Sequence, residues 1–99
     1  MRKLITVTIT GDITFANAII EGDGFRLLPV DGNQWKGKHF VNIEAPLVEI
    51  RSIVKGAYLA KYKVVTTING IPQDYDGLVK SSDRFTYAGK DFLLSDFNI

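Results

Sequence analysis

Residues 58–71, which read YLAKYKVVTTINGI, constrain the fold of this chain more than any other stretch. They alternate with a period of two, the period of a β-strand with one buried face. Most of them are β-branched or aromatic, so local preference agrees with the period. The buried face should hold the even-numbered side chains Tyr58, Ala60, Tyr62, Val64, Thr66 and Ile68. The stretch therefore predicts a central strand.

The dipeptide Asn69-Gly70 predicts a tight hairpin directly after this strand, because it supplies the two positive-φ positions of a type I′ turn. Three pairs then follow: Ile68 with Ile71, Thr66 with Gln73, and Val64 with Tyr75. Pro72 falls where the backbone nitrogen points away from the partner strand, and proline cannot donate to a further neighbour. We therefore expect residues 71–75 to form an edge strand.

Short strands separated by turn signals are predicted for most of the remaining chain. Residues 3–10 should bury Ile5, Val7 and Ile9, and residues 47–55 should bury their even positions. In residues 13–20 we expect Ile13, Phe15 and Ile19 to share a face. Further strands are expected at residues 25–30, 39–44, 84–88 and 91–99, with the last two paired around Gly89-Lys90.

The path between residues 47–55 and the central strand has two interpretations. A three-residue loop would pair them and set Ile50 opposite Tyr62, whereas a Greek-key connection would leave them unpaired. In either case, seven to nine short strands in 99 residues predict one domain, residues 1–99. The expected fold is an all-β antiparallel β-sandwich of the immunoglobulin-like or jelly-roll kind, with a closed barrel as the alternative. The runs TVTIT and YKVVT resemble strands of bacterial and phage immunoglobulin-like modules. This resemblance is too general to identify a family.

Composition excludes several classes of function. The 12 basic and 11 acidic residues nearly balance, which argues against nucleic acid as the ligand, since its binders carry a basic excess. The absence of cysteine excludes disulfides and thiolate sites. Neither a signal peptide nor a membrane span can be recognised, so we expect a soluble protein whose compartment the sequence leaves unknown.

Catalysis and metal binding find little support among the residue types. His39 is the only histidine and lacks the partners of a catalytic triad, so we interpret it as an ordinary surface or strand-end residue. The DYDG run at residues 74–77 resembles the start of a calcium loop, but Leu78 stands where another oxygen ligand belongs. We therefore expect no metal site, no cofactor and no enzyme activity. A small hydrolase remains an alternative that would need two close carboxylates in a cleft.

Trp35 is the main candidate for ligand contact. It lies in a polar stretch, residues 31–38, that we expect to be a loop, beside Asn33, Gln34 and Lys36. An exposed indole there could stack on a sugar ring or anchor a protein interface. The competing interpretation is that Trp35 folds back and caps the core. The tyrosines Tyr58, Tyr62 and Tyr75 are expected in the core, whereas Lys61, Lys63 and Arg51 are expected on one solvated face.

The expected edge strand offers a second interaction surface. Ile71, Gln73 and Tyr75 could receive a strand from a partner protein or from a second copy of the chain. The sequence thus predicts a non-catalytic binding, adhesion or structural module that acts through loops or an open sheet edge. It could work alone or within a larger surface or virion-like assembly. The alternative is a carbohydrate-binding module with Trp35 as its stacking platform.

Overall fold

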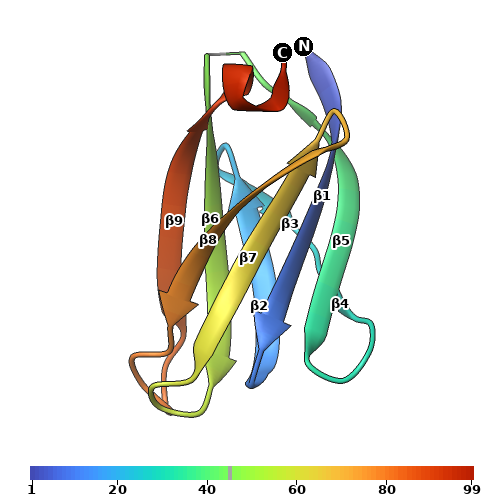
Figure 1. The fold of residues 1–99 in the computed structure, drawn as a ribbon. Helices are drawn as coiled ribbons and strands as arrows, with labels where there is room; N and C mark the ends of the chain where they lie inside the picture. The colour runs from blue at the N-terminus through green and yellow to red at the C-terminus, as the bar shows by residue number, and fades with distance from the viewer. Residues whose placement is uncertain (45) are drawn as a thin grey trace.

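Two antiparallel sheets packed face to face make up the molecule (Figure 1). The computed structural model describes residues 1–44 and 46–99. Its strands are β1 (Arg2–Gly11), β2 (Ile13–Ile20), β3 (Asp23–Phe25), β4 (Leu28–Pro29), β5 (Gln34–Asn42), β6 (Leu47–Gly56), β7 (Lys61–Ile68), β8 (Ile71–Leu78) and β9 (Thr86–Leu93), and a short 3-10 helix, η1 (Leu94–Phe97), follows them. The predicted all-β sandwich is confirmed. None of the described segments forms a helix long and apolar enough to cross a membrane.

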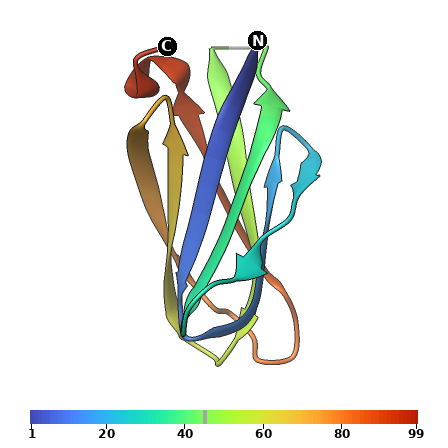
Figure 2. The same cartoon turned by 90° about the vertical axis from the view of Figure 1, so that its right-hand side faces the viewer.

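The five-stranded sheet has the order β4-β5-β1-β7-β8, and the four-stranded sheet has the order β3-β2-β6-β9. Figure 2 shows the hairpins β7–β8 and β2–β3 on opposite sides of the molecule. Alternate residues of the long strands fill the space between the sheets. As predicted, β1 buries Ile5, Val7 and Ile9, and β6 buries its even positions. Full burial of one such aliphatic side chain contributes about 1.5–3 kcal/mol to the free energy of folding. These two strands therefore supply a large part of the stability of the core.

The predicted hairpin between β7 and β8 is confirmed. Asn69 and Gly70 have φ angles of 57° and 76°, as a type I′ turn requires. All three predicted pairs are present, and β8 lies at the edge of its sheet. Thus a local turn signal and a period of two were sufficient to predict this part of the fold.

Of the two interpretations of the path from β6 to β7, the one that pairs these strands is wrong. β6 pairs with β2 and β9, whereas β7 pairs with β1 and β8 in the other sheet. The chain crosses between the sheets at residues 57–60, so the Greek-key interpretation holds. Tyr58 lies on this crossing and is 64% exposed, which corrects its expected place in the core. Lys61 and Lys63 are likewise on a different sheet from Arg51, so the three do not share a face.

Two other predictions were wrong for local reasons. A bulge between Ile13 and Phe15 reverses the alternation in β2, so Phe15 faces outward although Ile13 is buried. At the C-terminal end, Gly89-Lys90 does not turn the chain. Residues 86–93 form the single strand β9, which continues into η1. A glycine within a strand is tolerated where no side chain is needed, so it was a misleading turn signal here.

Candidate functional site

Three exposed aromatic side chains gather on the four-stranded sheet. Phe15 belongs to β2, Phe85 directly precedes β9 and Tyr87 lies within β9, and their exposed fractions are 38%, 47% and 62%. The rings of Phe15 and Phe85 meet edge to face, with centroids 5.6 Å apart. The Lys55 ammonium nitrogen lies 5.8 Å from the Phe85 centroid. We call Phe15, Phe85 and Tyr87 the aromatic cluster.

Strand register brings the aromatic cluster together. β6 lies between β2 and β9, and Lys55 of β6 is opposite Phe15. Tyr87 is opposite Ile53, whose side chain also faces outward. The bulge in β2 turns Phe15 to this outer face, where it approaches Phe85. Residues far apart in the sequence therefore form one apolar surface.

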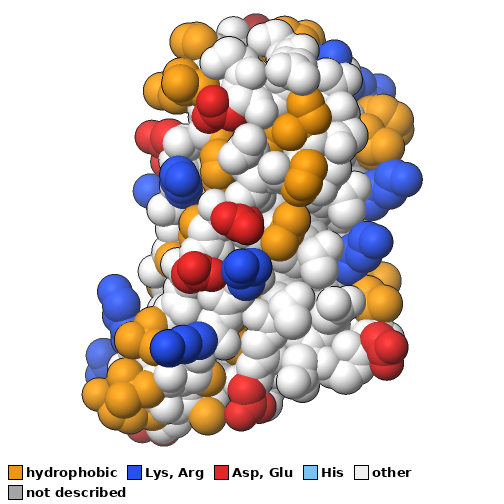
Figure 3. Space-filling model, viewed as in Figure 1, with side chains coloured by type: hydrophobic (Ala, Val, Ile, Leu, Met, Phe, Trp, Pro, Cys, Tyr) orange, Lys and Arg blue, Asp and Glu red, His pale blue; other side chains and the backbone are white. Residues whose placement is uncertain are grey.

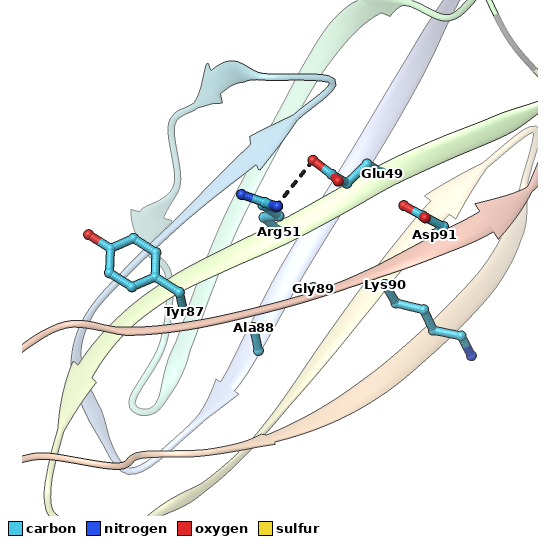
Figure 4. A pocket seen from close by; sticks show the side chains of 7 residues that line it. All are labelled: Glu49, Arg51, Tyr87, Ala88, Gly89, Lys90 and Asp91. Atoms are coloured by element: carbon cyan, nitrogen blue, oxygen red, sulfur yellow. Dashed lines mark ion pairs between the residues drawn. The ribbon is translucent and has the colours of Figure 1, made fainter.

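A hollow of about 420 Å³ adjoins the aromatic cluster on the same outer face (Figure 4). Gly89 is among the residues that line it, and we call it the Gly89 hollow. Arg51 is opposite Gly89, and Glu49 is opposite Asp91 on the neighbouring strand. Figure 4 shows Tyr87 and Asp91 on the same side of β9, whereas Lys90 points to the other side. The volume falls in the range of small-molecule sites, roughly 300–1,000 Å³.

The charged residues that line the Gly89 hollow are Glu49, Asp91, Arg51 and Lys90, and the Lys90 side chain points to the other side of β9. Arg51 Nε lies 3.2 Å from Glu49 Oε1, and the two side chains are 58% and 40% exposed. Within residues 1–44 and 46–99, no ion pair is found for Asp91. The backbone N–H of Glu49 donates to Glu21 Oε1 at 2.9 Å. The rim therefore presents carboxylate acceptors and guanidinium donors to a ligand.

Trp35 lies within β5, which begins at Gln34. The loop expected at residues 31–38 is therefore wrong. The Trp35 side chain is half-buried, packs against the core, and lies 5.7 Å from the Phe15 ring centroid. Trp35 thus supports the aromatic cluster from the side. The expectation that Trp35 caps the core agrees with this packing more closely than the expectation of a free indole.

The other residues predicted to act with Trp35 do not share its surface. Gln34 and Lys36 precede and follow it on the strand, so their side chains point to the opposite face of the sheet. Asn33 lies in the preceding turn, where its carbonyl accepts the Gly11 N–H at 3.0 Å. The structure therefore divides this predicted group between two faces and a turn.

The residues predicted for a sheet-edge interface have half-buried side chains. Gln73 donates to the Asp96 carbonyl at 3.1 Å, and the Tyr75 hydroxyl donates to the Ile50 carbonyl at 3.3 Å. Ile71 packs against the core. These three side chains thus contact the interior, so a partner at this edge would contact mainly the backbone and the exposed side chains of Pro72, Asp74 and Asp76.

Burial raises the pKa of Tyr75 from 10.0 to about 12, and the neighbouring Tyr62 adds to the rise, whereas a hydrogen bond with Ser52 opposes it. Tyr62 Oη and Thr66 Oγ1 are buried nearby, and neither finds a hydrogen-bond partner in the part of the chain that the structure describes. The polar side chains of Tyr62, Thr66 and Tyr75 lie between the sheets, so they affect the stability of the fold rather than contact with a ligand.

His39 lies in β5, where its Nε2 donates to the Arg26 carbonyl at 3.0 Å and its ring packs edge to face on Phe25. Asp74 and Asp76 are part of the regular strand β8, so they do not form the calcium-type loop considered from the sequence. No group of three or more His, Cys, Asp or Glu side chains suited to a metal ion occurs within residues 1–44 and 46–99.

Sequence reasoning missed the aromatic cluster and the Gly89 hollow. The run FTYAGKD at residues 85–91 carries their signal, because alternate residues Phe85, Tyr87, Gly89 and Asp91 share one face of a strand. Treating Gly89-Lys90 as a turn hid that alternation. The chain matches no protein-family model, no curated protein and no solved structure with which it was compared.

Proposed function

We propose that the protein is a non-catalytic binding module whose partner contacts the outer face of the four-stranded sheet. The aromatic cluster supports this proposal most directly. Exposed aromatic side chains are enriched where proteins bind partners. Here the rings of Phe15 and Phe85 meet, and the exposed Tyr87 lies two residues after Phe85. An adhesion or structural role within a larger assembly is compatible with the same surface.

The sheet edges formed by β8 and β9 support partner binding less well than this face. The edge of β8 carries Pro72, which lacks an N–H, and the exposed acidic residues Asp74 and Asp76. The edge of β9 carries Lys90, which is opposite the buried Ile50 and so points inward. Prolines and inward-pointing charges are devices that protect edges against strand addition. Strand addition at Ile71, Gln73 and Tyr75 stays a prediction.

Hydrolysis is less well supported than binding, although Glu49 and Asp91 are directly opposite each other. A glycosidase needs one carboxylic acid with a raised pKa, which burial usually provides. Glu49 is 40% exposed, and Asp91 is also exposed. Solvated carboxylates suit hydrogen bonding to a ligand better than they suit general acid catalysis.

Two matched variants test the proposed face. One replaces Phe15, Phe85 and Tyr87 with serine, and the other replaces Leu4 and Phe40, exposed side chains on the five-stranded sheet, with serine. Circular dichroism and thermal unfolding identify conditions in which both are folded. Self-association is then measured by sedimentation equilibrium, and ligand binding on a glycan array.

We expect any association of the native chain to be lost in the triple variant and kept in the control. Association that survives in the triple variant, or that both variants lose equally, would contradict the proposed face. A native chain that neither self-associates nor binds a glycan would contradict it for these two classes of partner.

A further inference from the structure

We propose that the Gly89 hollow binds one sugar unit of a neutral saccharide, which stacks on the Tyr87 ring. The inference rests on the proposed function, because it names the ligand class of the same face. It moves the expected carbohydrate platform from Trp35, which is half-buried, to Tyr87.

Tyr87 provides the apolar part of the site. Its side chain is 62% exposed and borders the hollow, so much of the ring is open to a ligand. A pyranose ring has an apolar face of C–H groups, and such groups pack well on the negative face of an aromatic ring. Phe85 lies two residues away on the same side of the chain and extends this apolar surface toward Phe15.

Glu49 and Arg51 provide the polar part of the site. Their ion pair, with Nε and Oε1 3.2 Å apart, presents hydrogen-bond donors and acceptors side by side. Each sugar hydroxyl can both donate and accept, so two neighbouring hydroxyls can bind a carboxylate and a guanidinium together. Asp91, which is opposite Glu49, adds a second carboxylate acceptor.

The balance of charge favours a neutral sugar. Glu49 and Asp91 bring two negative charges to the lining, and Arg51 and Lys90 bring two positive charges, so the lining has no net charge. The Lys90 ammonium points away and lies 5.2 Å from the Phe92 ring centroid. A hollow without net charge gives an acidic sugar no net electrostatic attraction, so a neutral sugar, whose hydroxyls can bind both the carboxylates and the guanidinium, fits it better.

The absence of a side chain at Gly89 leaves room for Arg51 in the lining of the hollow. A Cβ at this position would lie 2.9 Å from Arg51 Cγ, so an alanine would displace the arginine. Gly24 provides a matched control on the same sheet. Gly24 pairs with Ile19 of β2, and Ile19 pairs with Arg51 of β6. A Cβ added to Gly24 would meet nothing within 4 Å.

The test uses the ¹⁵N-labelled full chain and nuclear magnetic resonance titrations. The neutral probes are methyl glucoside, methyl mannoside, methyl galactoside and cellotetraose, and the acidic probe is glucuronate. Two variants alter the site, Gly89→Ala and Tyr87→Ala. Two controls match them, Gly24→Ala and Tyr58→Ala, since Tyr58 is 64% exposed but lies on the crossing between the sheets.

At least one neutral probe should shift the amide signals around Gly89 in a saturable way. The Gly89→Ala and Tyr87→Ala variants should weaken this binding by about tenfold or more, and the controls should leave it unchanged. Saturable shifts elsewhere on the chain, tighter binding of glucuronate, or no shift at the hollow at tens of millimolar of every neutral probe would overturn the proposal.

The same samples separate this inference from the proposed function. If no sugar binds, yet the chain self-associates through the aromatic cluster, the binding face stands and the saccharide inference fails. Cleavage of cellotetraose, followed by chromatography, would instead contradict the non-catalytic role.

Discussion

The molecule has a second hollow, which differs from the Gly89 hollow in both size and lining. The second hollow has a volume of about 650 Å³ and lies around Gly77 on the five-stranded sheet. Thr10, Lys61, Lys63, Asp76 and Leu78 contribute to its walls. It is the larger of the two, but the only aromatic side chain at its wall, Tyr62, is 2% exposed.

The two glycines have different roles. A Cβ on Gly77 would overlap the Tyr62 ring, so the absence of a side chain serves packing between the sheets. At Gly89 the nearest obstacle is the flexible Arg51 side chain on the outer face. We therefore interpret Gly77 as a structural glycine and Gly89 as a glycine that shapes a surface.

The surroundings of the two hollows differ in the same way. The five-stranded sheet presents threonines of β1, a narrow strip of apolar side chains and scattered charges to solvent (Figure 3). The four-stranded sheet presents the aromatic cluster and opposed carboxylates. Threonines and charged side chains are well solvated, whereas covering exposed aromatic rings with a ligand removes apolar surface from water and so favours binding.

The largest expected difference is in stability. Gly77→Ala should lower the free energy of unfolding by about 2–3 kcal/mol, because the added methyl group overpacks the Tyr62 ring. Gly89→Ala should change it by less than about 1 kcal/mol, because Arg51 can move into solvent. Urea unfolding of both variants measures the difference. Equal losses would show that the two glycines do not have separate roles.

The aromatic cluster should depend on Phe15. Phe15→Ala removes the ring that contacts both Trp35 and Phe85, so we expect a loss of about 1–2 kcal/mol and a red shift of Trp35 emission. Leu4→Ala is the control, since Leu4 is 37% exposed on the other sheet and Phe15 is 38% exposed. An unchanged emission spectrum in Phe15→Ala would contradict the contact with Trp35.

Alkaline pH should weaken the interior beneath the five-stranded sheet. The Tyr75 pKa is raised from 10.0 to about 12, so the folded state keeps this phenol protonated where the unfolded state loses the proton. Stability contributed by this group is therefore complete below pH 10 and is lost as the pH rises toward 12. Each tenfold change in proton affinity corresponds to about 1.4 kcal/mol, and partial exposure of Tyr75 reduces the total to about 1–2 kcal/mol.

Unfolding curves at several alkaline pH values measure this loss, and Tyr75→Phe serves as the control. The variant should lose stability less steeply than the native chain over the same range. A native chain that unfolds with the same pH dependence as Tyr75→Phe would show that Tyr75 is not the responsible group.

The smallest expected effect is an increase in stability. Thr66→Val replaces a buried hydroxyl, for which the described residues offer no partner, with a methyl group of similar shape. We expect the free energy of unfolding to rise by about 1 kcal/mol. Thr67→Val on the half-exposed side of β7 should change it less. A loss of stability in Thr66→Val would mean that the hydroxyl is satisfied in solution.

Local sequence signals determined four strands, β1, β6, β7 and β8, and one hairpin of this protein. The alternation in β1, β6 and β7 follows from the burial of one face, and Asn69-Gly70 specifies its turn through two positive φ angles. Pro72 marked β8 as an edge because proline cannot donate to a further strand. Each of these inferences needs only neighbouring residues.

The tertiary structure alone decided which strands became neighbours and therefore where a site could form. A period of two describes one strand but does not name its partner, so β6 and β7 were wrongly paired. The bulge that turns Phe15 outward and the register that sets Glu49 opposite Asp91 arise from pairing across the sheet. The candidate site joins residues of three strands, and contacts of that range are set by packing rather than by local preference.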